Sequence, residues 1–111
     1  MASATWKSFE RHVAKKLGGI RMGPTGRTTN DVDHPEFAVE CKYLKAIPDW
    51  LIKAMNQAKI NSSSDKKTPV LFLKRPRTRE KDDLVCMYAS DFYDWFGVDA
   101  RKVNDKGHKE E

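Results

Sequence analysis

Residues 30–43 read NDVDHPEFAVECKY, and the pattern of this segment is the main basis for predicting the fold. Apolar side chains occupy every second position from residue 37 to residue 43, which is the period of a half-buried strand. Glu40 and Lys42 lie between them, so both point to the face opposite the apolar row. Asp31 precedes this strand in a turn. If it folds back beside the strand, two carboxylates and an ammonium group converge.

An acid two positions before a lysine is a weak signal in a chain this rich in both residue types. About two such triplets are expected by chance, and the chain contains Glu40-Cys41-Lys42 and Asp65-Lys66-Lys67. The second lies in a polar, serine-rich loop. The first is distinguished by its context, since it sits on an alternating strand with an acid upstream and an amphipathic helix downstream.

Length and charge limit the possible functions. A chain of 111 residues is expected to form one domain, which we place over residues 1–97. Residues 98–111 have little apolar surface to bury, so we expect a charged, flexible tail there. The net charge of +5 and the pI of about 9.3 suit a polyanionic partner, although they also fit a merely soluble basic protein.

The two cysteines and the hydropathy pattern exclude other classes. Cys41 and Cys86 lie in strand-like runs with no histidine nearby, so we expect free, buried thiols instead of a zinc site. Free thiols are typical of a reducing compartment. No run resembles a membrane span or a signal peptide, so we expect no membrane partner.

The other elements follow from periodicity and from turn residues. The expected elements, in chain order, are a helix over 5–17, a short strand from residue 20, a strand over 37–43, a helix over 48–61, strands over 70–74 and 84–88, and a helix over 91–96. This order predicts an α/β domain with a small mixed central β-sheet flanked by helices. Glu10 falls on the apolar stripe of the first helix, which is unusual for an acid. Gly18-Gly19 is expected to end that helix, and Ser90 to cap the last one.

These residue types suit phosphodiester hydrolysis. The reaction needs an activated water and neutralised charge on the phosphoryl oxygens, and Mg²⁺ can supply both. Mg²⁺ prefers hard oxygen ligands and keeps several waters, so two carboxylates and one backbone carbonyl suffice. We predict Asp31, Glu40 and the Cys41 carbonyl as these ligands. Lys42 is expected to hold or deprotonate the attacking water.

The arrangement resembles the PD-(D/E)xK nuclease superfamily, and within it the small Holliday-junction-resolvase-like endonucleases, including phage-encoded ones. The resemblance covers roughly residues 5–96. It is carried by the segments Leu17-Gly18-Gly19, Asn30-Asp31-Val32-Asp33-His34-Pro35, Val39-Glu40-Cys41-Lys42 and Pro48-Asp49-Trp50-Leu51 with Gln57-Ala58. Asn30 stands where the family motif has proline, and asparagine is also a good turn former.

The resemblance implies a restriction-endonuclease-like fold, Mg²⁺ or Mn²⁺ as cofactor, and a cytoplasmic location in a bacterium or phage-infected cell. It implies Glu10, Asp31, Glu40 and Lys42 as the catalytic set, with Gln57 as a helper from the following helix. Glu10 would join the metal site directly or through water. Asp33 remains an alternative or additional ligand to Asp31.

Two groups of residues are candidates for binding DNA. The first lies around the Gly-Pro-Thr-Gly loop and comprises Arg21, Arg27 and Thr28. The second comprises Lys74, Arg75, Arg77 and Arg79. Both can contact backbone phosphates, and neither has a base-recognition signature. The second group fits a solvated hairpin tip almost equally well.

The sequence thus predicts a Mg²⁺-dependent endodeoxyribonuclease, most concretely a resolvase of four-way or branched DNA. Because a junction has two-fold symmetry, we expect a homodimer, for which Trp50, Phe92, Trp95 and Phe96 are candidate contacts. One alternative is another nuclease activity on the same fold, such as nicking, flap cleavage or restriction-type cleavage. Two others are a non-catalytic DNA-binding module and a basic interaction protein.

Overall fold

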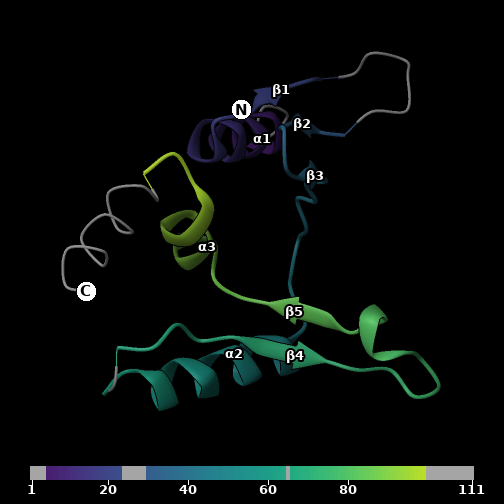
Figure 1. Cartoon of the computed structure of the whole chain (residues 1–111), viewed down its shortest axis with the longest axis vertical. Coiled ribbons are helices and arrows are strands. Elements are labelled where there is room, and N and C mark those ends of the chain that lie inside the picture. Colours follow the sequence, from purple (N-terminus) through teal and green to yellow (C-terminus); the bar gives the residue numbers. More distant parts are fainter. Residues whose placement is uncertain (1–4, 24–29, 65, 100–111) are drawn as a thin grey trace. The chain divides into compact units, whose positions relative to one another are not determined.

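A computed structural model of the chain describes residues 5–23, 30–64 and 66–99. It confirms a small α/β protein, with helices α1, α2 and α3 and two antiparallel sheets in the described residues (Figure 1). The strands are only two or three residues long. One sheet has the order β1-β2-β3 and the other joins β4 to β5, whereas the sequence predicted one central sheet.

The chain divides into two compact units, and each is described by itself. The first comprises Met1–Leu44 with Tyr93–Glu111, and the second comprises Lys45–Phe92. Asp31, Glu40 and Lys42 belong to the first unit. Gln57 and the basic loop after residue 73 belong to the second. A single domain over residues 1–97 stays a prediction.

The first unit is built on α1 (Thr5–Leu17), which has the bounds predicted from its apolar stripe. Val13, Ala14 and Leu17 are buried, and so is Glu10. Gly18 ends the helix with a φ of +77°, a left-handed conformation that glycine adopts without steric cost. The Gly19 N–H then donates to the Ala14 carbonyl (2.8 Å), which closes the last turn and sends the chain into β1.

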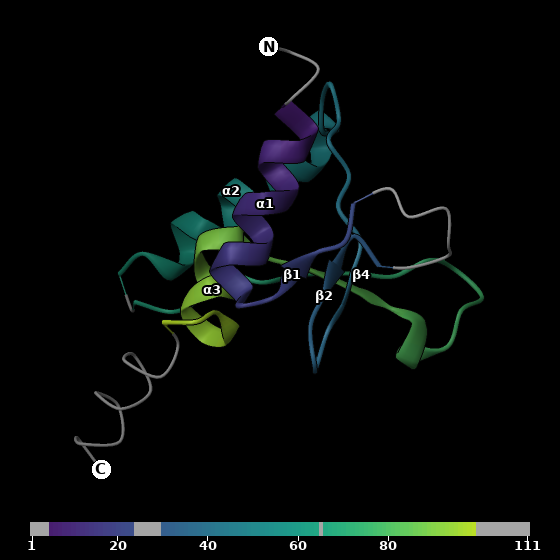
Figure 2. The ribbon, with the colours of Figure 1, turned by 90° about the horizontal axis from the view of Figure 1, so that it is seen from above.

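The first sheet consists of β1 (Ile20–Arg21), β2 (Val32–Asp33) and β3 (Ala38–Val39), and α1 packs against β1 and β2 (Figure 2). Val32 is fully buried and pairs with Arg21 on one side and Val39 on the other. Since opposed residues share a face, these three side chains lie on one face of the sheet.

The predicted strand over 37–43 is wrong in its extent, because β3 ends at Val39. The pairing with β2 stops at Val32. Two residues beyond Val39, the Cys41 N–H donates to the side chain of Asp31. The carboxylate thus takes the place of a ladder hydrogen bond, and the regular strand ends before Glu40.

The second unit contains α2 (Asp49–Ser62), β4 (Leu71–Leu73), the 3₁₀ turn η2 (Glu80–Asp82) and β5 (Leu84–Cys86). Pro48 stands just before α2, and its carbonyl accepts the N–H groups of the first turn (3.0 and 3.2 Å). The predicted apolar face of α2 is confirmed by Met55, which is buried. Both strands are shorter than predicted, and Phe72 pairs with Val85 across them.

Helix α3 (Ala89–Phe96) begins before the predicted start. The Phe92 N–H donates to the Tyr88 carbonyl (3.0 Å), so Tyr88 precedes the first turn and Ser90 lies inside the helix. The prediction that Ser90 caps α3 is therefore wrong. In the predicted tail, the Val98 N–H donates to the Lys16 carbonyl (2.9 Å), and residues 100–111 lie outside the described residues. None of the described helices has the length and apolarity needed to cross a membrane.

Candidate functional site

Asp31 is bonded to the segment that carries Glu40 and Lys42. Its Oδ2 accepts a hydrogen bond from the Cys41 N–H at 2.6 Å, and its own N–H donates to the Val39 carbonyl at 2.9 Å. In the ladder Val39 pairs with Val32, so the second bond is one residue out of register. The backbone leaves regular pairing at Asp31, and its carboxylate turns toward the Glu40–Lys42 segment.

Glu40 and Lys42 lie side by side, as expected from their spacing. The Lys42 Nζ lies 3.2 Å from Glu40 Oε2, and both side chains are well exposed, at 72% and 61%. An exposed ion pair of this kind contributes little to stability. Both groups are therefore accessible to a metal ion or to a phosphate. Asp33 pairs with Ala38 across the strands. Asp31, and not Asp33, is therefore the acid that is hydrogen-bonded to the Glu40–Lys42 segment.

Glu10 is placed differently from the other acids. Its Oε1 accepts a hydrogen bond from Arg21 Nε at 2.8 Å, and the two side chains are 10% and 18% exposed. Arg21 also lies over the Trp6 ring, and its Nη2 is buried without a hydrogen-bond partner among the described residues. Arg21 was predicted to bind phosphate. In the structure its charge is neutralised by Glu10.

The Glu10–Arg21 pair provides a test of how Glu10 acts. Replacing Glu10 by alanine leaves the Arg21 charge buried and unpaired, so we expect a loss of about 3 kcal/mol in the free energy of unfolding. The double replacement Glu10→Leu with Arg21→Met should recover most of that loss. Urea denaturation measures both, with the exposed Glu36→Ala as control. A loss below about 0.5 kcal/mol for Glu10→Ala would contradict a structural pair.

An open cavity of about 260 Å³ lies beside these residues. It is lined by Trp6, Phe9, Glu10, Cys41, Lys42 and Tyr43. Glu10 and Lys42 thus face the same cavity although they come from distant parts of the sequence. The aromatic lining was not predicted. Trp6 and Phe9 are three apart on α1, and this spacing on one helix face was the available signal.

The pKa of the Cys41 thiol depends on burial and on nearby acids. Its pKa is raised above 9.0 by burial first, and then by the negative charges of Asp31, Glu10 and Glu40. A thiol responds measurably only to charges close to it. The charges of these three carboxylates therefore act on the pKa of Cys41, which also lines the cavity. Tyr93 is also half-buried, and burial raises its pKa, with a further contribution from Cys41.

We expect Cys41 to be alkylated slowly at pH 8 and faster only as the pH rises above 9.0. Because the folded thiol holds its proton more tightly than the unfolded one, its contribution to stability is present below pH 9.0 and is lost above it. Iodoacetamide rates in a Cys86→Ser background measure the pKa. Asp31→Asn should lower it, and an unchanged value would contradict the proximity of that carboxylate.

The candidate site offers few oxygen ligands for Mg²⁺. Asp31, Glu40 and the Cys41 carbonyl provide hard oxygen ligands, and water would fill the rest of an octahedral shell. Within the described residues, no group of three or more His, Cys, Asp or Glu side chains is arranged to hold a metal ion. Glu10 is paired with Arg21, and its part in the metal site stays a prediction.

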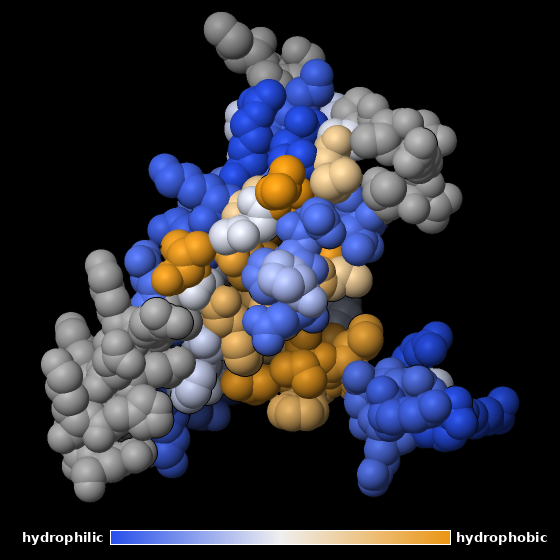
Figure 3. Space-filling view, turned by 45° about the horizontal axis from the view of Figure 1, so that its top comes forward, coloured by the Kyte–Doolittle hydropathy of each residue, from blue (hydrophilic) through white to orange (hydrophobic). Residues whose placement is uncertain are grey.

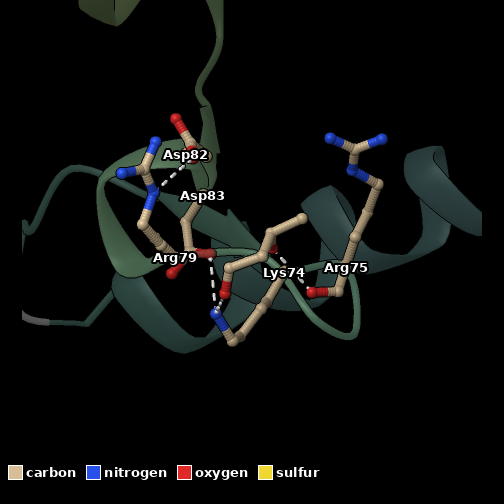
Figure 4. A network of polar contacts seen from close by, with 6 residues as sticks. Lys74, Arg75, Arg79, Asp82 and Asp83 are labelled. Atoms are coloured by element: carbon tan, nitrogen blue, oxygen red, sulfur yellow. Dashed lines mark hydrogen bonds and ion pairs between the residues drawn. The ribbon is translucent and has the colours of Figure 1, made fainter.

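Gln57 and the basic loop lie in the second unit. The Gln57 amide donates to Asn61 Oδ1 (3.0 Å), and its role beside the acids stays a prediction. In the loop, Lys74 bonds to the Thr78 carbonyl (2.9 Å) and to Asp83 (3.2 Å), and Arg79 lies 3.6 Å from Asp82. Figure 4 shows these two cations turned toward aspartates, whereas the Arg75 guanidinium points away from the network.

Arg77 completes the exposed part of the loop, with a φ of +66°. Such a left-handed conformation is uncommon for a residue with a Cβ, and it holds the side chain at the tip of a turn. The loop forms a strongly hydrophilic projection in the space-filling view (Figure 3, lower right). Arg27 and Thr28, the remaining predicted DNA contacts, lie outside the described residues.

Comparison of the chain with protein-family models, with curated proteins and with solved structures gave no match. The case for a function therefore depends on the residues and geometry of the chain itself.

Proposed function

We propose that the protein is a Mg²⁺-dependent endodeoxyribonuclease whose site lies in the first unit, at Asp31, Glu40, Cys41 and Lys42. The observation that carries the proposal is the 2.6 Å hydrogen bond between the Asp31 carboxylate and the Cys41 N–H. It joins an acid that precedes β2 to an exposed acid–lysine pair that follows β3. Convergence of these three side chains is what the chemistry of phosphodiester hydrolysis requires.

Each residue of the site has a separate role in the proposed hydrolysis. Asp31, Glu40 and the Cys41 carbonyl would hold Mg²⁺ or Mn²⁺, which neutralises phosphoryl charge and lowers the pKa of bound water when present. Lys42, which is paired with Glu40 in the structure, would position the attacking water beside the phosphate. Glu10 stabilises the wall of the cavity through Arg21, and it can act on the site through water.

The fold and assembly belong to the same proposal. We infer a restriction-endonuclease-like arrangement of the elements and a homodimer that cuts branched DNA symmetrically. Trp50, Trp95 and Phe96, the proposed dimer contacts, are large apolar side chains that are exposed, as contact with a second subunit requires. Phe92 is half-buried.

The basic loop is proposed to bind DNA chiefly through Arg75 and Arg77, because Lys74 and Arg79 are paired with aspartates. We expect Arg75→Gln and Arg77→Gln each to reduce the slope of log K against log salt by about one. Lys74→Gln and Arg79→Gln should change it by less than half as much. Fluorescence anisotropy over a range of salt concentrations measures the slopes. Equal effects of all four variants would contradict the distinction.

The test of the function is cleavage of a labelled four-way junction and a matched linear duplex, with Mg²⁺ or with EDTA. A resolvase makes paired nicks in the junction alone and only with Mg²⁺. Cleavage of the duplex as well would support a nuclease that has no specificity for junctions. Folded protein that binds DNA without cutting either substrate would overturn the nuclease and leave the DNA-binding module. This second candidate is favoured by the neutralisation of Glu10 by Arg21.

A further inference from the structure

A second cavity lies in the second unit and has no part in the proposed nuclease site. Its volume is about 350 Å³, within the range of roughly 300–1,000 Å³ that is typical of small-ligand pockets. It is lined by residues from the end of α2, from the segment before β4 and from the start of α3. Those that matter to the argument are Lys59, Lys66, Lys67, Tyr88, Ser90 and Asp91.

The lining is positively charged. Among the described residues that line it, three lysines face one aspartate, so these charged side chains sum to +2. Lys59 Nζ lies 5.5 Å from the centroid of the Tyr88 ring, a cation–π contact that holds this ammonium in place. Tyr88 is itself tied to α2, since its hydroxyl lies 3.4 Å from Asn56 Oδ1. These contacts place the Lys59 ammonium beside Tyr88 at the cavity.

The backbone around the cavity is also specialised. Lys66 has a φ of +54°, the left-handed region that residues with a Cβ rarely occupy. The Lys67 N–H donates to the Ser62 carbonyl (3.2 Å), which folds the segment back against the end of α2. Ser90 and Asp91 belong to the first turn of α3, whose N–H groups have no partner within the helix.

From the cavity, its net charge and the fixed ammonium group, we infer that this pocket binds a phosphate group carried on a nucleotide. A cavity of about 350 Å³ is larger than a phosphate alone needs, and lysines are common phosphate ligands. The phosphate belongs either to the backbone of a DNA strand or to a free mononucleotide. The inference does not depend on the nuclease proposal, since the pocket shares no residue with that site.

The lysines and the aspartate should have opposite effects, which makes the inference testable. Removing one charge about 4 Å from a phosphate weakens binding about five-fold. Lys59→Gln, Lys66→Gln and Lys67→Gln should each raise the Kd for inorganic phosphate by about that factor. Asp91→Asn should lower it by a similar factor. Lys53→Gln, an exposed lysine of α2 that does not line the cavity, is the matched control.

The experiment is a titration of the whole protein, followed by two-dimensional ¹⁵N–¹H NMR, with inorganic phosphate, thymidine monophosphate and a short single-stranded oligonucleotide. We expect phosphate to shift amide signals of residues 59–67 and 88–91, with the stated changes in Kd. Oligonucleotide affinity that falls in the same lysine variants identifies the source as DNA. Effects confined to phosphate and thymidine monophosphate identify a free nucleotide. No shift of these signals, or a Kd unchanged in both the lysine variants and Asp91→Asn, would overturn the inference.

Discussion

Replacing Glu40 or Lys42 by alanine is expected to lower the rate of Mg²⁺-dependent DNA cleavage by about 10²–10⁴-fold and to leave the fold intact. The loss follows because Glu40 is one of the two carboxylates proposed as metal ligands, and Lys42 is the cation paired with it. The fold should survive because both side chains are exposed and their ion pair contributes little to stability.

Single-turnover cleavage measures the effect, and circular dichroism with urea denaturation checks the fold. Glu36→Ala and Lys45→Ala are matched controls, since both residues are exposed charges close by in the sequence. Each control should cut at the wild-type rate. A Glu40→Ala protein that keeps more than a tenth of the wild-type rate would contradict the assignment, because a metal ligand cannot be removed at so small a cost.

Gly19→Ala is expected to destabilise the first unit by about 3 kcal/mol or more and to abolish cleavage with it. A Cβ at this position would lie 2.6 Å from the Asp33 carbonyl oxygen and 2.7 Å from Val32 Cγ1. The carbonyl is fixed in β2, and Val32 is fully buried, so neither can move aside. Since Asp31 adjoins β2, the change also disturbs the acid that joins the candidate site.

Gly23→Ala is the comparison for this prediction. Gly23 has a positive φ, +66°, and the nearest atom to a Cβ there is Arg21 Nη1, at an ordinary contact distance of 3.5 Å. We expect a cost of about 1–2 kcal/mol from the conformation alone. Thermal or urea unfolding measures the stability of both variants. Equal stability of the two proteins would contradict the close approach of Gly19 to β2.

Periodicity and turn residues predicted much of this fold. The stripe on α1, including the buried Glu10, followed from helical spacing, and Gly18-Gly19 marked the end of that helix. The apolar face of α2 was equally clear. These features are local, so the sequence within one element is enough to specify them.

The extent of the strands was not predictable in the same way. Alternation from residue 37 to residue 43 favoured one long strand, but β3 ends at Val39 because the Asp31 side chain replaces the next backbone partner. That exchange depends on a contact between residues ten apart. The pairing of Glu10 with Arg21 likewise depends on tertiary packing, which no spacing rule contains.

The loop between β4 and β5 shows a similar difference between composition and structure. Its basic residues were predicted as one group that contacts DNA. All four side chains are exposed in the structure, but Lys74 and Arg79 are paired with Asp83 and Asp82, whereas Arg75 and Arg77 have no ion pair among the described residues. Counting charges along the sequence could not reveal which cations are paired, since the pairs form across the turn.

Metal binding shows whether Asp31 and Glu40 hold one divalent metal ion, and the result does not depend on the choice of DNA. Calorimetric titration with Mn²⁺ compares the wild-type protein with the Asp31→Asn, Glu40→Gln double variant, and Asp33→Asn serves as control. We predict one Mn²⁺ bound by the wild type and by Asp33→Asn, and none by the double variant. Equal Mn²⁺ affinity in the double variant and the wild type would show that Asp31 and Glu40 do not hold the metal ion.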